Sequence, residues 1–146
     1  MDTSARLKDD LKTALKAGDR ERLEVLRFVS AQLQNRSIEK RGQGEGEALT
    51  EEEVLEVLRK DVKRRKEAIE LFKQGDRADL VEKESKEVDV IQAYLPAAPT
   101  EEQVREAIHA LRQEGLSEFP ILMKEAMKRL KGADGALVSK IVKETA

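Results

Sequence analysis

Apolar residues recur every three or four positions along nearly the whole chain. This spacing puts them on one side of an α-helix, and no segment shows a convincing strand pattern. Charged residues make up 40% of the 146 residues, well above the share in an average globular protein. They supply the long solvated faces that amphipathic helices require. The sequence therefore predicts an all-α fold with the size of one domain or two small ones.

Helix start and stop signals divide the first 95 residues into a helical body. The dipeptide Gly18-Asp19 offers a helix stop followed by an N-cap. The next apolar pattern ends at residues 41–48, where glycines alternate with polar residues, and we interpret this stretch as a flexible loop. Thr50 and Glu53 have the spacing of a capping box. The helix that starts there and the helix that follows are predicted to form an antiparallel hairpin turning near Gly75.

The residues after the body are predicted to form a small tail domain. The Pro96–Pro99 segment interrupts helical hydrogen bonding, so we expect it to be a linker. A second capping box at Thr100 and a candidate N-cap at Asp134 then frame three short helices over residues 100–146. A unit of about 50 residues buries only a marginal core of its own.

The register of the hairpin predicts one ion pair. Pairing residues whose numbers sum to about 150 places Ile69 opposite Val81. The same register brings Arg65 opposite Glu84, and each is the charged residue on an otherwise apolar stripe. We therefore predict a partly buried Arg65–Glu84 ion pair, with bidentate geometry, that fixes the register. The alternative is that Arg65 extends to solvent.

Several residue types that carry chemistry are scarce or missing. The chain has no cysteine, one histidine and four aromatic residues, which excludes thiol catalysis, cysteine-ligated metal sites and a stacking platform of several rings. It has no glycine-rich phosphate loop. The acidic run Glu51–Glu53 is better explained by a helix start than by a metal cluster. We therefore predict no catalytic residue, no metal site and no cofactor.

The sequence has no long uninterrupted apolar run. Its N-terminus lacks an apolar run of signal-peptide length. No later stretch approaches the roughly 20 apolar residues that a membrane span needs. These observations predict a cytoplasmic protein that does not contact a membrane.

The end of the chain carries a candidate phosphate-binding surface. Residues 119–146 hold six cations against three acids, whereas the whole chain has a net charge of −2. The six cations are Lys124, Lys128, Arg129, Lys131, Lys140 and Lys143. Three of them, Lys124, Lys128 and Lys131, are expected to form one helical row. A row of ammonium groups beside helix termini can bind phosphates, but a merely solvated surface is the alternative.

The core row of the same helix is predicted from its apolar residues. It consists of Met123, Met127 and Leu130, and it lies about 100° around the helix from the lysine row.

A secondary basic face is predicted on the third helix of the body. Its members are Arg59, Lys63, Arg64 and Lys66. The alternative interpretation is a solvated helix face that nearby acids balance.

Motifs along the whole chain resemble, in order, those of the GatB/YqeY family. They are Leu26–Asn35, Leu49–Val54, Lys63–Phe72, Gly75–Leu80, Glu84, Glu87, Tyr94–Pro96, Lys131–Gly135 and Leu137–Val138. The chain is identified as similar to a free-standing YqeY-like protein. Two departures stand out: Ala68 replaces a serine that is common in the family, and the turn at Gly132–Asp134 is one residue shorter than usual.

The resemblance implies a helical body followed by a three-helix tail. The same module ends the B subunit of the glutamine-dependent aminoacyl-tRNA amidotransferase and is appended to some glutaminyl-tRNA synthetases. In those proteins the tail is understood to hold tRNA, while catalysis resides in other domains. Family-level assignments extend carbon–nitrogen ligase activity, with glutamine as amido-N-donor, to free-standing members. This chain has neither a phosphate loop nor a Ser–Lys amidase pattern to support such activity on its own.

Two functions follow as hypotheses. The first is a non-catalytic, tRNA-binding accessory that acts with an aminoacyl-tRNA amidotransferase or synthetase, or as a free RNA-binding protein. The second is a protein–protein adaptor whose helical body docks on a translation-related partner, with the row of Arg59, Lys63 and Lys66 supplying charge complementarity.

Overall fold

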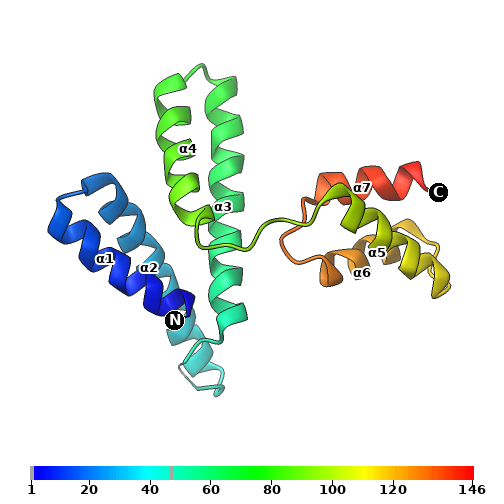
Figure 1. The fold of residues 1–146 in the computed structure, drawn as a ribbon, viewed down its shortest axis with the longest axis horizontal. Helices are drawn as coiled ribbons and strands as arrows, with labels where there is room; N and C mark the ends of the chain where they lie inside the picture. The colour runs from blue at the N-terminus through cyan, green and yellow to red at the C-terminus, as the bar shows by residue number, and fades with distance from the viewer. Residues whose placement is uncertain (1, 47) are drawn as a thin grey trace. The chain divides into compact units, whose positions relative to one another are not determined.

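The computed structural model describes residues 2–46 and 48–146. Within these residues the chain forms seven α-helices and no strand, which confirms the predicted all-α fold (Figure 1). The chain divides into two compact units, Met1–Leu95 and Pro96–Ala146, called the body and the tail below. No helix in the described part of the chain is long and apolar enough to cross a membrane.

Four helices make up the body, and local signals set their ends. They are α1 (Thr3–Ala17), α2 (Arg20–Gly42), α3 (Glu51–Gln74) and α4 (Ala78–Gln92). Gly18 ends α1 in a left-handed conformation with a φ of 71°. The Asp19 side chain then accepts a hydrogen bond from the backbone N–H of Arg22 and caps α2. The predicted capping box of Thr50 and Glu53 is present at the start of α3.

The loop predicted over residues 41–48 starts later than expected. Helix α2 continues to Gly42, because the last turn of a helix tolerates a glycine near its C-terminal end. Gly44 and Gly46 follow with positive φ angles. Glu47 lies outside the described residues.

Glu53 joins the end of α2 to the start of α3. Lys40 Nζ lies 2.7 Å from Glu53 Oε1 and also donates to the backbone oxygen of Ala48 at 2.9 Å. Glu53 in turn accepts a hydrogen bond from the backbone N–H of Thr50. The hydrogen bonds from Lys40 and Thr50 lower the pKa of Glu53 to about 2.

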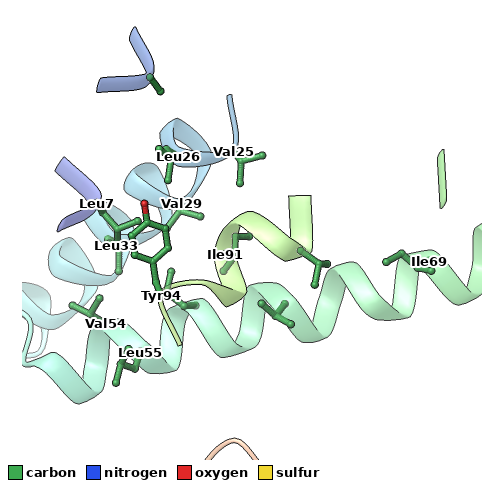
Figure 2. Close-up of a cluster of buried hydrophobic side chains, with 14 residues drawn as sticks. Leu7, Val25, Leu26, Val29, Leu33, Val54, Leu55, Ile69, Ile91 and Tyr94 are labelled. Carbon is green, nitrogen blue, oxygen red and sulfur yellow. The ribbon is translucent and has the colours of Figure 1, made fainter. Parts of the chain in front are cut away.

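The core of the body lies where the α3–α4 hairpin meets α1 and α2. Helices α3 and α4 run antiparallel side by side, as predicted (Figure 1). Leu58 and Val62 of α3 are buried together with Val88 and Ile91 of α4. All four helices contribute to this cluster of buried side chains (Figure 2). Burial of its apolar surface is the main force that holds the body together.

Tyr94 follows α4 by two residues, and its side chain connects the end of the body to α1 and α2 through hydrogen bonds. Its side chain lies in the core cluster, and the residue is only 4% exposed (Figure 2). The hydroxyl donates a hydrogen bond to Asp10 of α1 and accepts one from Arg22 Nη2 of α2 at 3.3 Å. The guanidinium of Arg6 lies 5.0 Å from the ring centroid. Burial, together with the hydrogen bond to Asp10, raises the pKa of Tyr94 to about 12.

We expect Tyr94 to titrate near pH 12 in the folded protein, two units above its ordinary value of 10. The unfolded chain releases this proton first, so the stabilisation is complete below pH 10 and is lost between pH 10 and about 12. Its size is at most roughly 2–3 kcal/mol. Phenolate absorbance reports this group alone, because the chain has one tyrosine and no tryptophan.

The control for this prediction is the variant Tyr94→Phe. The free energy of unfolding of the parent chain should fall between pH 10 and about 12 as Tyr94 loses its proton. The variant has no hydroxyl at this position, so its free energy of unfolding should not show this fall. A folded-state midpoint at the ordinary value would contradict a buried hydroxyl that donates to Asp10.

Three shorter helices form the tail. They are α5 (Glu101–Gln113), α6 (Phe119–Arg129) and α7 (Gly135–Glu144). The predicted capping box of Thr100 and Gln103 starts α5, and the Asp134 carboxylate accepts a hydrogen bond from the backbone N–H of Ala136 at the start of α7. Nine buried side chains form a core separate from that of the body: three from α5, two from α6, Leu130 directly after α6, and three from α7.

Candidate nucleic-acid interface

Helix α6 turns its two lysines away from the tail core. Its core-facing side chains are Leu122 and Ala126, and both are fully buried. At 100° per residue, Lys124 and Lys128 then lie on roughly the opposite side of the helix. Both lysines are exposed.

The predicted core row of α6 is wrong in one member. Met127 was expected to face the core, but it is 37% exposed, and Ala126 takes the buried place. The apolar residues of this short helix span more than one face, so sequence spacing alone allowed two core rows. Packing against α5 and α7 selects the row of Leu122, Ala126 and Leu130.

We call the solvent side of this helix the α6 outer face, defined by Ile121, Lys124, Met127 and Lys128. Lys124 has no ion pair among the residues that the structure describes, and Lys128 pairs with Glu125 at 3.6 Å in an exposed position. An exposed pair of this kind contributes little energy, so both ammonium groups are available to an anionic ligand. Ile121 and Met127 add exposed apolar surface to the same face.

Lys131 does not continue the helical row of Lys124 and Lys128. Helix α6 ends at Arg129, and Leu130 follows as its C-cap with φ of −108° and ψ of 66°. This break redirects the backbone before Lys131, so the regular spacing of a helix no longer applies.

The other tail cations contact different neighbours. Arg129 pairs with Glu114 at 2.8 Å, next to the C-terminal end of α5. Lys140 lies 3.9 Å from Glu144 on α7. Lys143 Nζ lies 5.7 Å from the ring centroid of Phe119. The structure thus gathers Lys124 and Lys128 on one face of the tail and gives Arg129, Lys140 and Lys143 separate partners.

The secondary basic face on α3 is partly neutralised. Arg59 pairs with Glu52 at 2.9 Å, and Arg64 pairs with Asp61 at 2.7 Å. Lys63 and Lys66 are both exposed, and neither has an ion pair within the described residues. A phosphate ligand would therefore meet two open lysines here, beside two arginines that are already paired.

The predicted Arg65–Glu84 ion pair is present between α3 and α4. Arg65 Nη1 lies 3.3 Å from Glu84 Oε2, so the hairpin has the predicted register. Arg65 also pairs with Glu87 through Nη1 and with Asp61 at 2.8 Å through Nε. The guanidinium therefore contacts three carboxylates, whereas the sequence predicted a bidentate contact with one.

Asp61 is the most buried member of this network, and the sequence interpretation missed it. Its side chain is 4% exposed and accepts hydrogen bonds from both Arg64 and Arg65. A signal for it exists, because Asp61 lies on the inner stripe of α3 between Leu58 and Arg65 and is four residues before the arginine.

Comparison with known proteins finds several relatives that share one name. The chain is 31% identical to "Altered inheritance of mitochondria protein 41, mitochondrial" of Pyrenophora tritici-repentis, over 95% of this chain and 78% of the relative. It is 32% identical to the protein of the same name in Lachancea thermotolerans, over 89% of this chain and 69% of the relative. The protein of that name in Kluyveromyces lactis is also 32% identical, with 89% and 70% covered.

These names contradict the prediction of a cytoplasmic protein. The relatives are called mitochondrial. The prediction rested on missing apolar segments, and a charged helical surface suits any aqueous compartment. Sequence composition therefore does not distinguish the cytoplasm from other aqueous compartments.

A family model covers nearly all of the chain. The family described as "Yqey-like protein" matches residues 4–146, which include every helix of the tail and all but the first residue of α1. The motifs that suggested this family therefore agree with a match over nearly the whole chain. The chain belongs to the YqeY-like protein family.

Proposed function

We propose that the α6 outer face binds tRNA and that the protein is a non-catalytic accessory of an aminoacyl-tRNA amidotransferase or synthetase. The observation that carries this proposal is the position of Lys124 and Lys128, which are exposed side by side and lack strong acidic partners. Membership in the YqeY-like family supports it through the resemblance of this tail to tRNA-holding tails.

The binding energy should come mainly from phosphate contacts. The tail has one aromatic residue, Phe119, so a set of rings that could stack on several bases is missing there. Neutralising a phosphate releases condensed counterions, and the affinity then falls as salt rises. If Lys124, Lys128 and Lys131 each contact one phosphate, a fourfold rise in salt should weaken binding roughly 20- to 40-fold. Filter-binding titrations with tRNA at two salt concentrations measure this change.

Reversing the charge of Lys124, Lys128 and Lys131 to glutamate should abolish tRNA binding and leave helicity intact. The matched control reverses Lys8, Lys12 and Lys16, which are three exposed lysines on α1. The control should retain most of the affinity, since it changes the net charge by the same amount. Equal binding by the tail variant and the parent chain would move the site away from α6, with Lys63 and Arg64 as the next candidates.

The two other assignments make different predictions. A protein–protein adaptor should retain its partner in a pull-down after nuclease treatment, whereas a tRNA-mediated association should disappear. An amide-forming enzyme should catalyse glutamine-dependent, ATP-driven amidation as the purified chain, and we expect none.

A further inference from the structure

The body contains a groove between α2 and α4 that no part of the proposed tRNA site uses. In Figure 1 the α1–α2 pair and the α3–α4 pair diverge, and α1 makes no contact with α4 in the described residues. Two cavities of about 340 and 410 Å³ lie along this divergence. They share Glu24 and Val25 of α2 with Lys83 and Glu87 of α4, so they form one continuous groove.

The floor of the groove is apolar. Val25 and Phe28 come from α2, Ala68 from α3 and Val90 from α4. Phe28 is 40% exposed, although Val25, Leu26 and Val29 on the same stretch of α2 are core residues. The guanidinium groups of Arg64 and Arg65 lie 5.5 and 5.1 Å from the centroid of this ring and border the floor at that end of the groove. An apolar floor of this kind favours burial of aliphatic side chains.

The rim of the groove is acidic on its α2 side. Counting each residue once, the described residues that line the two cavities include eight acids and five bases. The deep acids Asp61, Glu84 and Glu87 are already paired with Arg65. Glu21 and Glu24 are different, because they are exposed and have no ion pair among the described residues. The unbalanced negative charge therefore lies along the α2 rim.

The walls of the groove favour a helical ligand. Both walls are α-helices, whose backbone N–H and C=O groups are already paired within each helix, so an extended peptide would find no backbone partners. A helix satisfies its own backbone and can place successive side chains, one turn apart, into two cavities in line.

We propose that this groove docks an amphipathic helix of a partner protein, with its apolar stripe on Val25, Phe28, Ala68 and Val90. Lysine or arginine residues of that helix lie along the edge next to Glu21 and Glu24. Charge complementarity to the α2 rim selects the basic helix over an acidic one.

The test uses two synthetic helices of about 15 residues, a length at which isolated helices begin to form in water. One has a leucine stripe with lysines along one edge, and its counterpart has glutamates in place of the lysines. Titration into the full chain, followed by amide chemical shifts, should show saturable binding of the lysine peptide with changes at Val25, Ala68 and Val90. Absence of binding by the lysine peptide overturns the proposal.

Two charge-reversed variants then locate the site. The variant Glu21→Lys with Glu24→Lys should weaken binding of the lysine peptide by at least about tenfold, because like charges would face each other across the rim. Its matched control, Glu67→Lys with Glu70→Lys, has the same spacing and charge change on exposed positions of α3 outside the groove. Urea unfolding of both variants verifies that each is folded. Equal binding of the two peptides, or an equal loss in both variants, overturns the proposal.

Discussion

Replacing Arg65 by methionine is expected to lower the free energy of unfolding by about 3–5 kcal/mol, the range for removing one partner of a buried ion pair. The side chain of Arg65 is 12% exposed and contacts Asp61, Glu84 and Glu87. Its removal leaves three carboxylates close together, and one of them is buried. Urea unfolding followed by circular dichroism measures the change.

The control for Arg65 is its neighbour Lys66, which is exposed and has no ion pair in the described part of the chain. Lys66→Met should change stability by less than about 1 kcal/mol. Glu84→Gln should cost less than the loss of Arg65, because Arg65 keeps Asp61 and Glu87. A cost below about 1 kcal/mol for Arg65→Met would show that the network contributes little.

Replacing Leu122 by alanine is expected to unfold the tail while the body stays folded. Leu122 is fully buried among the nine side chains of the tail core. A leucine-to-alanine change in a core costs about 2–5 kcal/mol, and a unit of about 50 residues has only a few kcal/mol to lose. Because the tail has its own core, the damage should remain local.

Amide chemical shifts of the full chain measure this outcome directly. Signals of α5, α6 and α7 should lose their dispersion, and signals of α1 to α4 should keep theirs. Leu116→Ala provides the control, because Leu116 is only partly buried against the same core. If the tail signals of Leu122→Ala keep their native dispersion, the prediction is wrong, and the tail is more stable than the few kcal/mol expected for a unit of its size.

The sequence predicted the hairpin well because its evidence is repeated along two long helices. Over α3 and α4 the apolar stripes allow one register, and Arg65 and Glu84 are the charged positions that this register brings together. The partners Asp61 and Glu87 depend on side-chain directions around one guanidinium, which numbering alone does not give.

The candidate interface was predicted less completely because α6 is short. Eleven residues leave room for two apolar rows, so Met127 was assigned to the core and Lys131 to the lysine row. The choice of core row depends on where α5 and α7 lie, and the end of the row depends on the C-cap at Leu130. The groove between α2 and α4 has no sequence signal, since it arises from the divergence of two helix pairs.

The hydrogen bond from Tyr94 to Asp10 has a consequence for synthesis on the ribosome. It joins residues 84 positions apart, and a ribosome adding about 5–20 residues per second takes roughly 4–17 seconds to cover that distance. During this interval the inner side of α1 has no complete core to pack against. The contacts of α1 with Tyr94 therefore form last, after its contacts with α2 and α3 have become possible.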